Sequence, residues 1–108
     1  MVEFKINGRT WKVKMVNPTD ERLCAIEDQT VWGITNYAKC EIYLANNQSN
    51  SMIFDTLCHE LAHAYIMVYG HSQYESFSEE NVCDLFGAFA VDLVRNARQI
   101  FIEMGLTF

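Results

Sequence analysis

The sequence contains no run of about 18 consecutive apolar residues, so we expect no segment to span a membrane. Its start, MVEFKINGRTW, lacks the apolar stretch of a signal peptide, which predicts a cytoplasmic protein. The four cysteines, Cys24, Cys40, Cys58 and Cys83, form no Cys-x-x-Cys pair. Without an export signal we expect free thiols rather than a disulfide framework. No repeat, low-complexity segment or linker is present, which indicates one domain, residues 1–108.

The net charge of −6 is distributed unevenly along the chain. Residues 1–14 carry four basic residues and one glutamate, a balance of +3, which leaves −9 for the remainder. Phosphate binding needs clustered positive charge, so this acidic body argues against a nucleic-acid partner. We interpret the basic start as the solvated face of a strand. Because 50% of the residues are hydrophobic, the chain is expected to fold as a globule.

The first half of the sequence has the pattern of β-strands. Two short alternating runs flank Asn7-Gly8, the dipeptide that most strongly predicts a tight hairpin. The stretch NPTDERLCAI then predicts a turn and one short helix, with Thr19 or Asp20 as its cap. Two further strands are expected at about residues 30–36 and 40–45.

The second half has the pattern of two long helices. The first runs from Met52 to Tyr69, with Ser49 or Ser51 as its cap and Gly70 as its end. The second begins with a capping box from Ser76 to Glu79 and ends at Gly105. Its predicted apolar stripe is Val82, Leu85, Phe86, Phe89, Leu93, Ala97, Ile100 and Phe101. The fold class is therefore α+β, a small, mostly antiparallel sheet with helices packed on one side.

The stretch TLCHELAHAYI in the first of these helices predicts a metal site. His59 and His63 are four residues apart, so their imidazoles project from the same helix face and can bind one metal ion. Glu60 lies about 100° round the helix from His59, where it can hold a reacting water without ligating the metal. The sequence therefore predicts one zinc ion, Zn2+, per chain, with Glu60 as general base.

Catalytic zinc normally takes three protein ligands, and the second helix offers the third. Glu80 is the candidate, and Asp84 follows it by four residues on the same face. Like charges at this spacing repel unless a cation lies between them, so a metal would explain the pair. In this interpretation Glu80 binds zinc, while Asp84 accepts the N–H of a ligating histidine.

Four other side chains compete for these roles. On one continuous helix His71 would be about 12 Å beyond His63, so only a sharp turn at Gly70 could bring it to the metal. Glu79 could take the place of Glu80 as third ligand, but the residue four positions after it is a cysteine and not a second carboxylate. Cys58 and Cys83 are soft donors that zinc accepts, but we expect both to be small buried residues.

The motifs HELAH and ENVCDLFG together resemble the gluzincin metallopeptidases. In that family the HExxH helix is completed by a later helix carrying Glu-x-x-x-Asp. The spacing and the short chain look most like the minigluzincins and the phage-associated ImmA/IrrE-like peptidases, and the resemblance covers roughly residues 40–89. It implies a minimal zincin domain in which His59, His63 and Glu80 bind zinc. It also implies that Glu60 is the general base and that Asp84 is the outer carboxylate.

This sequence departs from the family in two ways. The larger thermolysin-like members have a second domain that supplies a histidine or tyrosine to the transition-state oxyanion, and this chain ends at Phe108. The candidates nearby are Tyr69, His71 and Tyr74. ImmA/IrrE-type regulators are often joined to a helix-turn-helix domain, which has no counterpart here.

These observations predict a zinc-dependent endopeptidase that acts on a peptide or protein substrate. The strand around Cys40–Leu44 is expected to form the rim of the cleft, with a free edge that pairs with an extended substrate. Two alternatives are a zinc-binding regulatory protein without hydrolytic activity, and a latent enzyme covered by its C-terminal EMGLTF. The edge strand and the aromatic C-terminus also make the chain a candidate homodimer.

Overall fold

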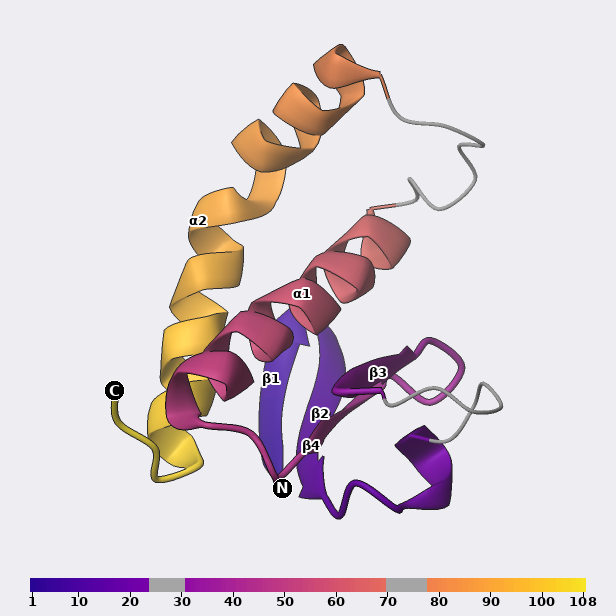
Figure 1. Ribbon diagram of the computed structural model, residues 1–108. Coiled ribbons are helices and arrows are strands. Elements are labelled where there is room, and N and C mark those ends of the chain that lie inside the picture. Colours follow the sequence, from indigo (N-terminus) through magenta and orange to yellow (C-terminus); the bar gives the residue numbers. More distant parts are fainter. Residues whose placement is uncertain (24–30, 70–77) are drawn as a thin grey trace.

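The computed structural model describes residues 1–23, 31–69 and 78–108. Its elements, in chain order, are β1 (Val2–Ile6), β2 (Arg9–Val16), the short 3-10 helix η1 (Glu21–Leu23), β3 (Gly33–Asn36), β4 (Glu41–Ala45), α1 (Asn50–Val68) and α2 (Glu79–Glu103). The strands form one mostly antiparallel sheet, and α1 crosses in front of it with α2 alongside (Figure 1). The expected α+β class is therefore confirmed.

The hairpin between β1 and β2 forms where the sequence predicts it. Asn7 and Gly8 connect the strands, and both have positive φ angles, 48° and 81°. Two successive positive φ angles match the right-handed twist of a two-residue hairpin, and asparagine and glycine accept them most readily. The resulting antiparallel register places Phe4 opposite Trp11, so that both rings reach the core face.

The sheet has the strand order β1-β2-β4-β3. β4 pairs in parallel with β2 on one side and antiparallel with β3 on the other. The expectation that the strand at Cys40–Leu44 has a free edge is therefore wrong, because both of its edges are occupied. The free edge on this side of the sheet belongs to β3, which pairs with β4 alone among the described strands.

The main core lies between the sheet and the two helices. α1 begins after Ser49, whose hydroxyl accepts a hydrogen bond from the Met52 N–H at 3.3 Å. This confirms one of the two expected caps. Leu57 and Leu61 are fully buried on the sheet side of α1, in the same core cluster as Trp11 of β2. The buried face of α1 consists of five apolar residues at three- and four-residue spacing, Ile53, Leu57, Leu61, Ala64 and Tyr65, together with Glu60.

A polar network joins the two helices at the edge of this core. The hydroxyl of Tyr65 donates to the carboxylate of Asp92 and accepts from the Asn96 amide at 2.7 Å. The same amide of Asn96 lies 3.2 Å from the main-chain carbonyl of Lys5, to which it donates. Burial is the main cause that raises the pKa of Tyr65, followed by the bond to Asp92. Tyr65 is therefore a neutral donor that ties α1 to α2, and Asn96 ties α2 to β1.

α2 begins later than the predicted capping box. Ser78 is the N-cap and accepts from the Asn81 N–H at 3.2 Å, so Glu79 is the first helical residue rather than the third. The negative charge of Glu79 at the N-terminal end of α2 interacts favourably with the helix dipole. Ser76 and Gly70 lie outside the described residues. At the other end Gly105 has φ of 76° and forms the predicted stop: its N–H bonds to Ile102.

Candidate metal centre

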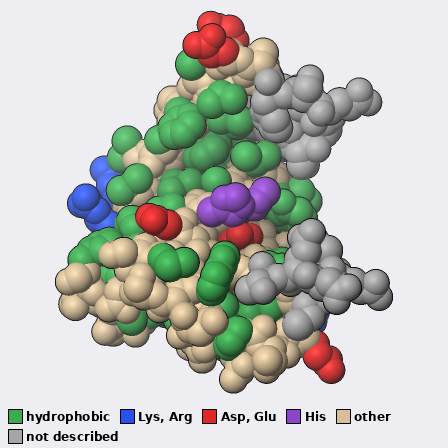
Figure 2. All heavy atoms as spheres, in the orientation of Figure 1, with side chains coloured by type: hydrophobic (Ala, Val, Ile, Leu, Met, Phe, Trp, Pro, Cys, Tyr) green, Lys and Arg blue, Asp and Glu red, His purple; other side chains and the backbone are tan. Residues whose placement is uncertain are grey.

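His59 and His63 lie on the outer face of α1, one turn apart. The packing of Leu57, Leu61 and Ala64 against the sheet turns this face towards solvent, and the His59 side chain is 69% exposed. The two imidazole rings have their centroids 5.0 Å apart at an angle of 73°. Figure 2 shows the two histidines as one continuous patch on the surface.

The histidine pair fits a shared metal ion. Two imidazoles bound to one zinc at about 2.0–2.1 Å in tetrahedral geometry have ring centroids roughly 5 Å apart. The observed separation of 5.0 Å satisfies this requirement. Imidazole nitrogen is also a ligand that zinc prefers. His59 and His63 could therefore supply two ligands without a change of helix geometry.

Glu60 lies beneath the histidines and not among the exposed residues of α1. It is only 6% exposed, one of two buried polar or charged residues in the described chain. Its Oε1 is 2.8 Å from the hydroxyl of Thr35, which also lies 3.1 Å from the Glu60 main-chain carbonyl. Its other oxygen, Oε2, is 3.9 Å from Nε2 of His59. The carboxylate is thus held between the edge strand β3 and the first histidine.

Gly33 allows β3 to lie this close to α1. A Cβ atom at this position would be 2.7 Å from Cγ2 of Thr56 and 3.1 Å from Cγ of Glu60. The first distance is shorter than real Cβ contacts, so a side chain here would push the strand away from the helix. A glycine inside a strand pattern is a known sign of close backbone approach, and the stretch VWGITN carried that sign.

Gln48 holds the residue before β3 in place through hydrogen bonds of its side-chain amide. This buried side chain donates to the carbonyls of Trp32 at 3.0 Å and Ala45 at 2.9 Å. Its Oε1 accepts from the hydroxyl of Thr56 at 2.7 Å, which ties the loop before α1 to the second turn of that helix. Gln48, Thr56 and Thr35 therefore hold β3 against the part of α1 that carries Glu60. None of the three was identified from the sequence.

Tyr37 directly follows β3 and is exposed. Its pKa is raised, mainly by burial and further by the negative charge of Glu60. The Tyr37 phenol is therefore neutral at physiological pH. Of the oxyanion donors expected from the sequence, Tyr69 stacks on Tyr65 and Phe89 at centroid distances of 6.3 and 5.9 Å. His71 and Tyr74 lie outside the described residues.

Glu80 and Asp84 are not brought to the histidines. Both are exposed in the first turns of α2, which diverges from α1 at this end (Figure 1). At 100° per residue Glu80 lies roughly opposite Phe89, which packs inward, so its carboxylate points away from the core face of α2. Within residues 1–23, 31–69 and 78–108, no three His, Cys, Asp or Glu side chains form a group that could hold a metal.

The other candidate ligands, Glu79, Cys58 and Cys83, do not complete the histidine pair either. Glu79 is exposed at the very start of α2. Cys58 is half-buried, and burial, followed by the charge of Asp55, raises the pKa of its thiol, which disfavours the thiolate that zinc binds. Cys83 is exposed, so the expectation that it is buried is wrong. In the first half of α2 the buried residues are Leu85 and Phe89, which turns Cys83 outward.

Comparisons with protein families, with curated proteins and with solved structures found no match to this chain. Neither described helix combines the length and apolar character required to cross a membrane. The site is therefore defined by its own geometry: two exposed imidazoles at metal-binding separation above a buried carboxylate that the edge strand holds.

Proposed function

We propose that the protein is a zinc-dependent endopeptidase, with His59 and His63 as metal ligands and Glu60 as general base. The observation that carries this proposal is the position of Glu60, a buried carboxylate beneath the two imidazoles, bonded to Thr35. An ordinary amphipathic helix has no reason to bury a carboxylate beside two exposed histidines, because burying charge is unfavourable unless it is used or paired.

The two oxygens of Glu60 have different partners, which suits proton transfer. Oε1 accepts from Thr35, so Oε2 is left on the side of His59, 3.9 Å from its Nε2. Zinc, when bound, would polarise a peptide carbonyl and activate water for attack. In this scheme Oε2 of Glu60 accepts the proton of the attacking water and later delivers it to the leaving amine.

The third ligand in the proposal is Glu80, with Asp84 as the outer carboxylate. Because both are exposed on α2, this assignment requires the start of α2 to close towards α1. For the substrate, the free edge of β3 lies beside Glu60, since Thr35 belongs to that strand. An extended peptide paired with this edge would be bound through its main chain, which favours peptides over other carbonyl compounds.

Glu60→Gln tests this function. The variant keeps the size of the side chain and a hydrogen-bond acceptor for Thr35, but it cannot take a proton. We expect hydrolysis of an unstructured protein in the presence of zinc to fall by about 100-fold or more, while zinc binding is retained. Asp55→Asn, an exposed carboxylate on the same helix, is the matched control and should retain activity. Activity that survives in Glu60→Gln would contradict the general-base role.

A second candidate function is a zinc-binding regulatory protein without hydrolytic activity. It is favoured by the finding that the described residues assemble two histidines but no third ligand.

Latency through the C-terminus is a third candidate. The tail lies at the start of α1, where the Thr107 carbonyl accepts from Asn50 at 2.7 Å and the Phe108 ring packs on Phe54 at 5.0 Å. Cleavage that appears only after residues 104–108 are deleted would favour latency. Zinc binding without cleavage in both forms would favour the regulatory function.

A further inference from the structure

Gln48 and Glu60 are the polar or charged side chains that the described part of the chain buries, at 8% and 6% exposed. Gln48 belongs to the loop before α1, and Glu60 lies inside that helix. Both form hydrogen bonds between α1 and the segment that contains β3. Burying a polar group is unfavourable unless its hydrogen bonds are formed, so the partners of each side chain indicate what it holds in place.

The Gln48 amide binds at the point where the pairing of β3 and β4 ends. The Trp32 carbonyl, just before β3, accepts from the Ala45 N–H at 2.9 Å and from Nε2 of Gln48 at 3.0 Å. Nε2 also donates to the Ala45 carbonyl, and the Thr56 hydroxyl donates to Oε1 at 2.7 Å. One side chain therefore connects the last residue of β4, the start of β3 and the second turn of α1.

Two polar contacts thus join the β3 segment to α1. The first runs from Trp32 through Gln48 to Thr56, and the second runs directly from Thr35 to Glu60. Thr56 and Glu60 are four residues apart, so they lie on nearly the same side of α1, about 6 Å apart along its axis. The first contact therefore helps to set the separation of strand and helix at which the second contact forms.

Gly33 lies between the two contacts and leaves little free space there. A Cβ at this position would be 2.7 Å from Cγ2 of Thr56 and 3.1 Å from Cγ of Glu60. The bond from the Thr35 hydroxyl to Glu60 is 2.8 Å long. Because O–H···O bonds form at about 2.5–3.0 Å, a displacement of the strand by about 1 Å would break this bond.

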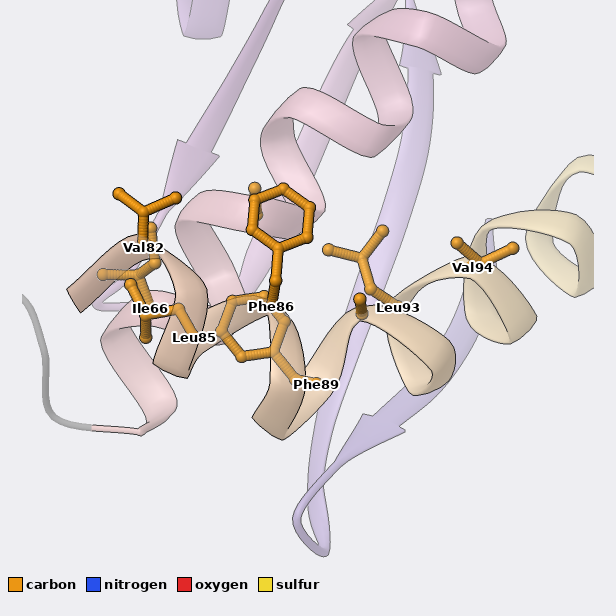
Figure 3. A pocket seen from close by; sticks show the side chains of 9 residues that line it. Ile66, Val82, Leu85, Phe86, Phe89, Leu93 and Val94 are labelled. Atoms are coloured by element: carbon orange, nitrogen blue, oxygen red, sulfur yellow. The ribbon is translucent and has the colours of Figure 1, made fainter. Parts of the chain in front are cut away.

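The other flank of α1 has no comparable polar contact near Glu60. There α1 and α2 line a groove of about 290 Å³ with an entirely apolar lining. Figure 3 shows Ile66 of α1 at this groove with Val82, Leu85 and Phe86 of α2. At 100° per residue, Ile66 lies about 120° round α1 from Glu60. Apolar contacts have no preferred direction, whereas hydrogen bonds do, so the orientation of Glu60 is set from the β3 side.

We propose that Gln48 is a positioning residue for hydrolysis, a role that rests on the proposed function, with Glu60 as base and the peptide on the free edge of β3. Gln48 is bonded both to the helix that carries the base and to the start of the strand that pairs with the peptide. It therefore sets the place of the base relative to the scissile bond. A misplacement of about 1 Å between reacting groups can lower a rate by about 100-fold.

Gln48→Met tests this role, because methionine has a similar length and forms none of the three bonds. We expect kcat for an extended peptide to fall by about tenfold or more, while KM and the dissociation constant of zinc change by less than about threefold. A merely structural role would instead lower kcat and zinc binding together, through loss of folded protein.

Thr56→Val is the milder variant and carries the test if Gln48→Met does not fold. It keeps the methyl group beside Gly33 and loses only the hydroxyl that Gln48 binds. We expect the same separation of kcat from KM, with a fall in kcat of about threefold or more. Thr56→Ser retains the hydroxyl and should lie closer to the wild type. Thr10→Val makes the same change at an exposed site on β2 and should leave both constants unchanged.

Carbon-13 NMR of the Glu60 carboxyl in the metal-free full chain gives a readout that requires no activity. Thr35→Val removes the hydrogen bond to this carboxyl and provides the reference shift. We expect Gln48→Met and Thr56→Val to move the resonance in the same direction, and Thr10→Val to leave it in place.

The two measurements separate this role from the proposed function. A wild type without hydrolytic activity would contradict the proposed function, and the carboxyl resonance would then decide whether Gln48 positions Glu60. An active wild type whose kcat and carboxyl resonance are unchanged in Gln48→Met and Thr56→Val would overturn the role of Gln48 and leave the proposed function standing. Parallel losses of kcat and zinc binding in these variants would also overturn it, in favour of a structural role.

Discussion

The hydroxyl of Thr35 lies 2.8 Å from Oε1 of Glu60, across 25 residues of sequence. Thr35 belongs to the edge strand β3, and Glu60 belongs to α1, between the two histidines. This contact explains how a carboxylate can be buried at the surface of the sheet with one oxygen turned towards His59. It makes Thr35 a positioning residue for the general base that we propose.

Thr35→Val should separate positioning from binding of the metal. The variant keeps the shape of the side chain but leaves the buried carboxylate of Glu60 without this donor. We expect a loss of about 1–3 kcal/mol in the free energy of unfolding, together with a lower kcat and little change in zinc affinity. Denaturant unfolding, steady-state kinetics and zinc titration measure the three quantities. Thr35→Ser retains the hydroxyl and should stay near the wild type, and equal losses in both variants would contradict the role of the hydrogen bond.

Gly33→Ala should disturb the contact between β3 and α1. The added methyl group would meet Thr56 and Glu60 at 2.7 and 3.1 Å. We expect a loss of about 1–3 kcal/mol in the free energy of unfolding, because one of them must move. Gly87→Ala is the matched control, since its methyl group meets no atom of the chain within 4 Å. Gly87→Ala should be neutral or stabilising. A harmless Gly33→Ala would show that the strand is not tightly packed there.

The pair of Asp20 and Arg22 predicts a pH dependence outside the site. Two side-chain hydrogen bonds from Arg22, at 2.9 and 2.7 Å, are the main cause that lowers the pKa of Asp20 from 3.8 to about 2. Because the folded-state pKa is lowered, the stabilisation by the pair is fully present above pH about 4 and is lost as the pH falls to about 2. NMR titration of the Asp20 carboxyl should find the low pKa in the wild type and a higher pKa in Arg22→Ala, which loses the side-chain bonds but keeps the main-chain N–H bond to this carboxyl. An unchanged midpoint in the variant would contradict this cause.

Local sequence signals predicted the elements well. The hairpin at Asn7-Gly8 formed because positive φ is a property of those two residues themselves. α1 followed from its apolar spacing, and Ser49 acted as one of its expected caps. The histidine pair followed from helix geometry alone, since a four-residue separation brings two side chains to the same face wherever the helix is placed.

Features that depend on distant contacts were not predicted. Thr35 and Gln48 act through hydrogen bonds to residues on other elements, and no local pattern marks those partners. The free edge was assigned to the strand at Cys40–Leu44 rather than to β3, because the sequence does not reveal the order in which strands pair. Val82 and Phe86 fit the helical stripe but are exposed, since α2 diverges from α1 where they lie. The placement of Glu80 depends on the same divergence.

The most direct test of the metal site is the count of zinc per chain by native mass spectrometry, on protein purified without a histidine tag. We expect one zinc ion per wild-type chain, none in His63→Ala, and weaker retention in Glu80→Ala. Zinc retained equally by wild type and Glu80→Ala would leave the histidine pair as the site and remove Glu80 from it. No zinc in the wild type after stoichiometric metal is added would contradict the metal centre, and with it the proposed peptidase.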